Sequence, residues 1–298
     1  MYKRQPYNLL KDLVSLGANF PLKASGLVGN DNDGDWIIKD CLANGIDASG
    51  LIKTNSASTS YTDAMSVLAT GRRTFFHHEG ANSLFNDKDV DLEVDGIKYF
   101  YLGYLLLLES LDEVLDNGKT GASELLAKAS KSGYTTIVDL VSAQLGDYRK
   151  VISPSLPEID ILFLNEFEAG SLLDLEVKES DLKSLLYAAR SVLDMGVRDC
   201  VILHSSYGAV GVSSSGETAI KGSVQLPNKM IKGAAGAGDA FAAGFIIGMN
   251  KAKPLKECIR YGACSAASCL LDATTSGGVI MMDDCLKIGE EYGFRGLN

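Results

Sequence analysis

The sequence predicts an α/β fold: a three-layer αβα sandwich with a mostly parallel central sheet and a small β lid. Short apolar runs typical of buried strands alternate with longer amphipathic stretches typical of helices. A Ser/Thr-rich region at about 49–80 interrupts this alternation with short β-prone runs. No linker, low-complexity tract or internal repeat divides the 298 residues. We therefore expect a single domain over residues 1–298, with the lid at about 49–80.

The first elements are a helix and a strand, each predicted from its periodicity. Leu9, Leu13 and Leu16 recur at helical spacing, and the apolar run 22–28 favours a strand. The segment 35–44 is expected to be a helix that ends at Gly45. In the lid, runs 61–68 and 73–78 are β-prone. The remaining strands are expected at 97–102, 135–140, 159–164, 200–203 and 210–213, and the remaining helices at 123–132, 166–173, 181–195, 239–249 and 255–269.

The amino-terminal residues are unusual for an α/β protein. No strand precedes the first helical pattern, and the opening letters MYKRQ resemble translated adapter sequence. We therefore expect an amino-terminal truncation of roughly thirty residues, enough for a core strand and a lid hairpin.

Charge and cysteine content exclude several classes of function. The net charge of -10 and the absence of a basic cluster disfavour nucleic acid and anionic membranes as partners. The strongest apolar run, 99–108, is too short to cross a bilayer. Six scattered cysteines and three histidines show no zinc spacing. We expect a cytoplasmic enzyme with reduced thiols.

The segment 233–241 (GAAGAGDAF) carries the clearest chemical signal. Its three glycines precede an apolar helical stretch, where backbone N–H groups and the helix dipole create a site for an anion. Asp239 stands at the start of that helix, beside the expected anion. Asp is also a favoured N-cap residue, so capping and catalysis are equally good interpretations of this segment alone.

The motif GAGDAFAAGF resembles the carboxy-terminal signature of the ribokinase (PfkB) family of carbohydrate kinases, and further motifs follow in the family's order. Asn8-Leu9-Leu10 resembles the family's N-x-A helix, and segment 29–34 with 45–47 resembles G-x-D-x-x-G followed by G-[IV]-D. Asn165 and Glu168 match N-x-x-E, segment 204–209 matches T-x-G-x-x-G-A, and 273–279 resembles the closing segment beside the nucleotide.

This resemblance implies roles for individual residues. Asp239 matches the base that takes a proton from the acceptor hydroxyl. Asn165 and Glu168 match residues that organise Mg²⁺ and the phosphates, with Glu168 reaching the metal through water; without the resemblance, a polar helix start would explain them. The amides expected to hold the transferring phosphoryl group belong to Gly236, Ala237 and Gly238.

Two regions depart from the family pattern. His204 stands where the family has Thr and Ser206 where it has Gly, so the expected ATP site around His204, Ser206 and Gly208 has altered donor contacts. Gly233 replaces the Asp that helps the family bind an activating monovalent cation. We expect K⁺ to activate this chain weakly or not at all.

The acceptor site also departs from the pattern, because the family's sugar-binding Asp and double glycine have no counterpart. Asn8 and Gly103 are the expected sugar contacts. Arg73 in the lid could contact an acidic substrate, although a solvent-facing or partner-facing arginine is the better interpretation. Asn82 is a weaker candidate.

The resemblance implies an ATP- and Mg²⁺-dependent kinase that phosphorylates a hydroxyl of a sugar or sugar acid and forms a homodimer through its lid. A nucleoside kinase of the same fold is the alternative enzyme, supported by Phe75 and Phe76. A sugar-binding regulator with impaired catalysis is the alternative outside enzymes; the intact Asp239 argues against it.

Overall fold

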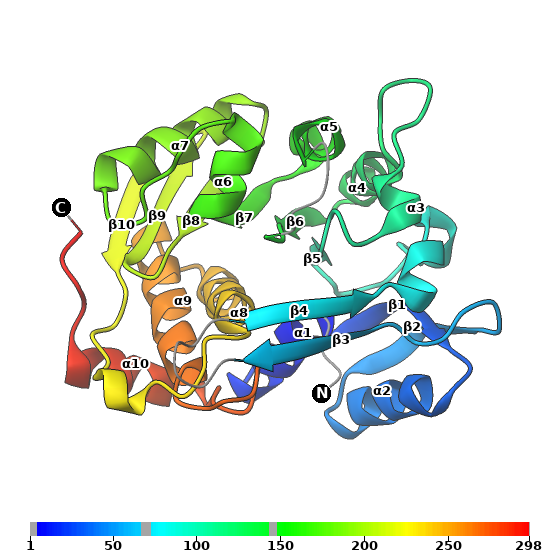
Figure 1. Cartoon of the computed structure of the whole chain (residues 1–298), viewed down its shortest axis with the longest axis horizontal. Helices are drawn as coiled ribbons and strands as arrows, with labels where there is room; N and C mark the ends of the chain where they lie inside the picture. The colour runs from blue at the N-terminus through cyan, green and yellow to red at the C-terminus, as the bar shows by residue number, and fades with distance from the viewer. Residues whose placement is uncertain (1–4, 67–72, 143–147, 298) are drawn as a thin grey trace.

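The computed structural model of the chain describes residues 5–66, 73–142 and 148–297. Figure 1 shows its helices and strands. The strands are β1 (Lys23–Gly29), β2 (Asp47–Thr54), β3 (Tyr61–Ser66), β4 (Arg73–His78), β5 (Tyr99–Leu102), β6 (Thr135–Asp139), β7 (Ile161–Asn165), β8 (Cys200–His204), β9 (Gly208–Ser213) and β10 (Thr218–Gly222). The α-helices are α1 (Gln5–Ser15), α2 (Asn32–Ala43), α3 (Glu109–Asp112), α4 (Gly121–Lys131), α5 (Tyr148–Ile152), α6 (Glu166–Leu173), α7 (Leu182–Asp194), α8 (Ala237–Asn250), α9 (Leu255–Cys269) and α10 (Met282–Tyr292). Short 3₁₀ helices lie at Gly80–Leu84, Asp87–Asp89, Ser153–Glu158 and Asn228–Met230.

The main sheet has six strands in the order β10-β9-β8-β7-β6-β5. Strands β5 to β8 run parallel, and β9 and β10 are antiparallel to their neighbours. Successive side chains point to opposite faces, so Leu162 and Leu164 join one hydrophobic core while Ile161 and Phe163 join the other. The sheet is therefore buried on both faces, as its near-continuous apolar strands predict.

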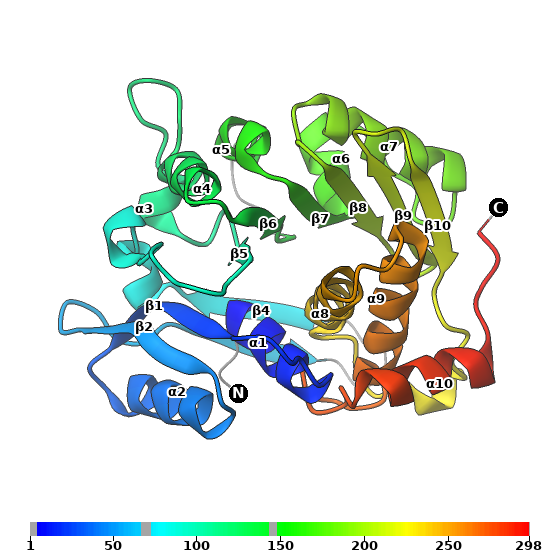
Figure 2. The same cartoon turned by 180° about the vertical axis from the view of Figure 1, so that it is seen from behind.

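Helices cover both faces of this sheet. Helices α4, α6 and α7 pack on one face, whereas α1, α8, α9 and α10 pack on the other. Figures 1 and 2 show these two helical layers from opposite sides. The three-layer α/β architecture expected from the sequence is confirmed.

Two smaller sheets stand apart from the main one. Strands β1 and β2 form a parallel pair, and β3 and β4 form an antiparallel pair. The expected lid boundary of 49–80 is corrected here, because residues 49–54 belong to β2, which pairs with β1. Four of the eight β2 residues are exposed, which explains why the run looked like part of a surface excursion.

Within the described residues, the predicted elements agree with the structure to within two residues, apart from the start of α2. Residues 67–68 of the expected run 61–68 lie outside the described residues. That helix begins at Asn32, because the Asp31 carboxylate caps it by accepting a hydrogen bond from the Gly34 N–H. Strand β10 and helices α3, α5 and α10 were missed; α3 and α5 are only four and five residues long. Strand β10 is short and buries Ala219 and Gly222, and α10 is rich in charged residues, so neither shows a strong apolar pattern. In the described ranges, no helix is long and apolar enough to cross a membrane.

Candidate active site

A cleft of about 2000 Å³ opens at the carboxyl ends of β6, β7 and β8. The glycine-rich segment before α8 and the first turns of α1 form another side, and lid residues from β3 and β4 line its rim. Ligands of parallel α/β sheets bind at the carboxyl ends of the strands. The cleft is therefore the candidate active site.

The turn into α8 depends on a glycine at residue 236. Gly236 is the N-cap residue and has a φ of +82°, a backbone conformation that favours glycine. A Cβ at this position would lie 2.1 Å from the Thr275 carbonyl oxygen. The helix start therefore packs directly on the closing segment, and its positive dipole end lies at the cleft.

The three residues expected to hold a phosphoryl group differ in their orientation. Gly236 and Gly238 line the cleft. The Ala237 N–H donates a long, 3.4 Å hydrogen bond to the Ala234 carbonyl oxygen, and Ala237 is not among the residues that line the cleft. Gly236 and Gly238 are therefore the members of the expected anion site that line the cleft.

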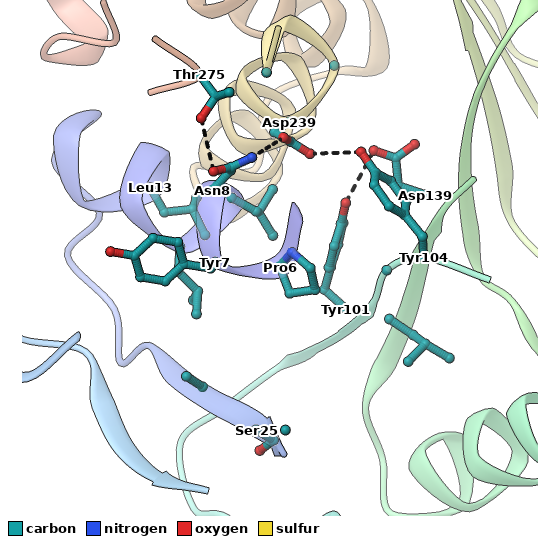
Figure 3. A pocket seen from close by; sticks show the side chains of 18 of the residues that line it. Pro6, Tyr7, Asn8, Leu13, Ser25, Tyr101, Tyr104, Asp139, Asp239 and Thr275 are labelled. Carbon is teal, nitrogen blue, oxygen red and sulfur yellow. Dashed lines mark hydrogen bonds between the residues drawn. The ribbon is translucent and has the colours of Figure 1, made fainter. Parts of the chain in front are cut away.

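Asp239 is the third residue of α8 and lines the cleft, although only 2% of its surface is exposed. Its Oδ2 accepts a 2.9 Å hydrogen bond from Asn8 Nδ2, and its Oδ1 accepts a 3.3 Å hydrogen bond from the Tyr104 hydroxyl. Figure 3 shows both contacts. Because Gly236 is the N-cap, the interpretation of Asp239 as the capping residue is wrong.

Asn8 is itself oriented by a third residue. The Thr275 hydroxyl donates a 3.1 Å hydrogen bond to Asn8 Oδ1, which leaves the amide nitrogen facing Asp239. Asn8 is 4% exposed and comes from α1. The expected sugar contact is therefore also a structural partner of the expected base.

Asn165 and Glu168 form a capping box at the start of α6. The Asn165 side chain accepts from the Glu168 N–H, and Glu168 Oε2 accepts from the Asn165 N–H at 2.8 Å. Glu168 Oε1 also accepts from the Ser142 hydroxyl at 2.8 Å. Both residues line the cleft. The capping and the phosphate-site interpretations are therefore compatible.

Asp139 is a site residue that the sequence reasoning missed. It ends β6, is 3% exposed, lines the cleft and accepts a 3.2 Å hydrogen bond from the Tyr101 hydroxyl. Burial, with the nearby carboxylates of Glu168 and Asp239, raises the pKa of Asp139 well above its ordinary value. The sequence feature that could have identified Asp139 is a single acidic residue at the end of an apolar strand.

His204, Ser206 and Gly208, which were expected around ATP, do not all lie at the cleft. His204 lines the cleft 5.5 Å from the Phe241 ring, measured between ring centroids, and burial lowers its pKa to about 4. It is thus uncharged at neutral pH. Ser206 Oγ donates to Glu179, and Gly208 packs on Lys221 and Gly222. Neither Ser206 nor Gly208 is among the residues that line the cleft.

Of the expected acceptor contacts outside α1, Gly103 and Asn82 line the cleft. Gly103 directly follows β5, and Asn82 lies in the 3₁₀ helix Gly80–Leu84. Arg73 belongs to β4, but its side chain lies outside the described part of the structure.

The donor set suits a sparsely held magnesium ion. No group of three or more metal-ligating side chains gathers among the residues that the structure describes. Burial raises the pKa of Glu168 to about 7, and its charge disfavours ionisation of Asp139. A divalent cation would favour the ionised form of both buried carboxyl groups. Mg²⁺ usually takes one or two carboxylates, with water and phosphate supplying the other oxygens. Glu168 and Asp139 therefore fit such an ion.

Comparison with known proteins identifies a family, relatives in sequence and a similar fold. The profile described as pfkB family carbohydrate kinase matches residues 6–279. A 5-dehydro-2-deoxygluconokinase of Clostridium perfringens is 26% identical over 97% of this chain and 85% of its own. The adenosine kinase of Saccharomyces cerevisiae is 30% identical over 69% of this chain and 60% of its own. The ribokinase of Arabidopsis thaliana, solved with ribose and ATP, superimposes with a TM-score of 0.76 at 21% identity, covering 95% of this chain and 85% of its own.

Proposed function

The chain belongs to the pfkB family of carbohydrate kinases, and from this premise we propose that it transfers the γ-phosphoryl group of ATP to a hydroxyl of a sugar or sugar acid. The observation that carries the proposal is the pairing of Asp239 with the glycine turn at 236–238. A buried carboxylate and a helix start meet at one point of the cleft. Phosphoryl transfer needs a positioned base beside groups that stabilise the charge of the phosphoryl oxygens.

The proposed reaction assigns one step to each of these groups. The acceptor oxygen attacks the γ-phosphorus, the bond from the γ-phosphorus to the β–γ bridging oxygen breaks, and ADP leaves. Asp239 takes the proton of the acceptor hydroxyl. The backbone N–H groups of the α8 start, with the helix dipole, stabilise the negative charge on the phosphoryl oxygens. Mg²⁺, when bound, neutralises phosphate charge.

Glu168 and Asp139 would hold that Mg²⁺ on the side of the cleft formed by β6 and β7. The Asn165 and Ser142 side chains fix the Glu168 carboxylate by hydrogen bonds. The use of ATP and Mg²⁺ is supported by the similar fold of an Escherichia coli protein described as a putative ribokinase II in complex with ATP and Mg²⁺.

The acceptor class follows from the relatives and from the cleft lining. The kinase of Clostridium perfringens is named for a gluconate derivative, and the yeast relative for a nucleoside. Asn8, Gly103 and Tyr104 line the cleft around Asp239, which provides hydrogen-bonding groups for a polyhydroxylated acceptor. The nucleoside kinase remains the alternative, because Tyr101 and Tyr104 offer aromatic surface in the same place.

The experiment that tests the proposal measures phosphoryl transfer from radiolabelled ATP to three sets of acceptors: neutral sugars, sugar acids and nucleosides. The Asp239→Asn variant serves as the matched control in every reaction. Transfer to a sugar or sugar acid that is lost in the control is expected. Transfer to nucleosides alone would show that the protein is a nucleoside kinase. Sugar binding without transfer to any acceptor would favour a sugar-binding regulator.

We also propose that the chain forms a homodimer through the β3–β4 hairpin. Three apolar side chains of this hairpin are exposed: Tyr61, Met65 and Phe76. A two-stranded sheet is marginally stable by itself, and pairing with a second copy would cover its edge and its apolar face. Sedimentation analysis should find a dimer that Met65→Lys dissociates; a wild-type monomer at every concentration would contradict the proposal.

A further inference from the structure

A compact group of residues holds the base of the β3–β4 hairpin, and we call it the hairpin anchor. It consists of three segments: 29–34 at the junction of β1 and α2, 58–60 before β3, and 80–81 after β4. Figures 1 and 2 show the base of the hairpin beside the end of β1. The segment 29–34 carries the G-x-D-x-x-G pattern of the sequence, to which the proposed reaction assigns no role.

Asp31 connects the start of α2 to the residues that lead into β3. Its Oδ1 accepts hydrogen bonds from the Gly34 N–H at 2.8 Å and from the Thr59 hydroxyl at 2.6 Å. Its Oδ2 accepts a third, from the Thr59 N–H at 2.7 Å. Burial alone would raise the pKa of Asp31, but the hydrogen bonds outweigh burial and lower the pKa below its ordinary value. The carboxylate is therefore charged at neutral pH, which strengthens these bonds.

The three segments of the hairpin anchor are in close contact. The Thr59 hydroxyl accepts a 2.9 Å hydrogen bond from the Gly29 N–H, and a Cβ at Gly29 would lie 2.4 Å from the Thr59 nitrogen. The Ser58 carbonyl oxygen accepts a 2.8 Å hydrogen bond from the Ala81 N–H, and a Cβ at Gly80 would lie 2.4 Å from that oxygen. Strand β3 begins two residues after Thr59, and β4 ends two residues before Gly80. Both strands therefore leave the same fixed point.

Residues just beyond the anchor line the cleft, whereas Asp31 and Thr59 do not. Ser60 is 3% exposed, and its hydroxyl has no hydrogen-bond partner in the described part of the chain. Thr62 pairs with His77 across the hairpin, and the Thr62 hydroxyl lies 2.7 Å from His77 Nδ1. Ser60, Thr62 and His77 all line the cleft. A polyhydroxylated acceptor would supply the partner that a buried hydroxyl requires.

We propose that Asp31 is a positioning residue of the kinase: by holding Thr59, it fixes the base of the β3–β4 hairpin on the acceptor side of the cleft. Ser60, Thr62 and His77 are the side chains that it places there. This role rests on the proposed function. If the hairpin held its place only a tenth of the time, the acceptor would bind about tenfold more weakly, because it binds only the fraction in place. ATP affinity should not change, because the α8 start, β6 and β7 form the phosphate side.

The Asp31→Asn variant tests this role, because an amide keeps one function of the carboxylate and loses another. The amide oxygen still accepts from the Gly34 N–H and caps α2, since Asn is as good an N-cap residue as Asp. The amide nitrogen is a donor and cannot accept from the Thr59 N–H. The variant should raise KM for the acceptor about tenfold and leave kcat and KM for ATP within about twofold of wild type.

Two comparisons separate positioning from a general loss of stability. Asp181→Asn makes the same substitution at the N-cap of α7, at a residue that does not line the cleft, and should change neither KM. Thr59→Val removes the hydroxyl that bonds to Asp31 and should raise KM for the acceptor as Asp31→Asn does. Thr59→Ser keeps that hydroxyl and should stay near wild type.

Hydrogen–deuterium exchange measures the hairpin without any acceptor. The amides of Thr59, β3 and β4 should exchange at least about fivefold faster in Asp31→Asn than in wild type, while those of β6 and β7 keep their rates. Four results would overturn the proposal: an unchanged KM for the acceptor, an equal rise in both KM values, the same rise in Asp181→Asn, or unchanged exchange in the hairpin. If the wild-type protein transfers phosphate to no acceptor, the proposed function fails, and the exchange comparison still decides whether Asp31 holds the hairpin.

Discussion

The side-chain amide of Asn8 donates a 2.9 Å hydrogen bond to Asp239 Oδ2 and so connects α1 to the start of α8 across 231 positions of the sequence. The Tyr104 hydroxyl reaches the other carboxylate oxygen. Each oxygen of Asp239 therefore has a side-chain donor from a different part of the chain. A carboxylate held in this way has a fixed orientation towards the cleft, which a general base requires.

Asp239→Asn should abolish phosphoryl transfer while leaving the fold and ATP binding intact. The amide keeps the size of the carboxylate but cannot take the acceptor's proton, and loss of a general base costs about 10²–10⁴-fold. Steady-state rates, with calorimetry for ATP, measure the effect. Turnover within about threefold of wild type would show that Asp239 is not the base.

Tyr104→Phe should lower kcat about tenfold, because it removes one of the two donors that orient Asp239. A hydrogen bond to a charged group contributes about 1.5–3 kcal/mol. Tyr148→Phe is the matched control: it removes the same atom from another buried tyrosine, whose hydroxyl donates to the Val141 carbonyl oxygen and which does not line the cleft. The melting temperatures of the two variants are first shown to match. An equal loss of kcat in both would then contradict a role for the Tyr104 hydroxyl in orienting Asp239.

The contribution of Glu168 to the stability of the magnesium-free protein should fall as the pH rises from about 4.5 to about 7. Burial raises the pKa of Glu168 from 4.5 to about 7, so the folded state binds a proton that the unfolded state has released in this window. This contribution is therefore highest below the unfolded pKa of Glu168 and is lost as Glu168 ionises, on the order of 3 kcal/mol in total.

Urea unfolding of wild type and Glu168→Gln at pH 5 and pH 7.5 measures this loss. The comparison separates it from the parallel contribution of Asp139 and from the opposite contribution of His204, whose pKa burial lowers to about 4. The difference in unfolding free energy between wild type and Glu168→Gln should shrink or reverse at the higher pH. Added Mg²⁺ should restore part of the loss in wild type alone. A difference that does not change with pH would show that Glu168 is ionised throughout.

Gly236→Ala should destabilise the protein and disrupt the anion site. A left-handed φ costs a residue with a Cβ about 1–2 kcal/mol, and the new Cβ would also meet the Thr275 carbonyl oxygen at 2.1 Å. Gly238→Ala is the control, since its Cβ would lie 3.6 Å from the His204 ring, an ordinary contact. Thermal unfolding should separate the two variants by several degrees; equal melting temperatures would contradict the assigned turn.

K⁺ should activate the kinase weakly or not at all. Gly233 supplies no carboxylate, and its nearest neighbours are atoms of Asp272 and Ala273, including backbone oxygens. Hard cations depend on charged oxygen ligands for tight binding. Initial rates in a potassium salt and in a tetramethylammonium salt at equal ionic strength provide the test, and a tenfold stimulation by K⁺ would refute the expectation.

The sequence by itself determined the alternation of strands and helices, because apolar periodicity reports which face of each element is buried. It also located the glycine turn and Asp239, since a turn with positive φ before a helix requires glycine at a fixed position. The capping box of Asn165 and Glu168 is local as well: its two residues are three positions apart, and their spacing alone brings them together.

Only the tertiary structure decided what surrounds Asp239. Asn8, Tyr104 and Thr275 come from three distant segments, and no local pattern encodes their hydrogen bonds. The same holds for Asp139, whose burial beside Glu168 depends on the order of strands in the sheet. The division between the β1–β2 sheet and the main sheet was likewise invisible in the sequence, because periodicity records burial of a strand's faces and carries no information on which edges are paired.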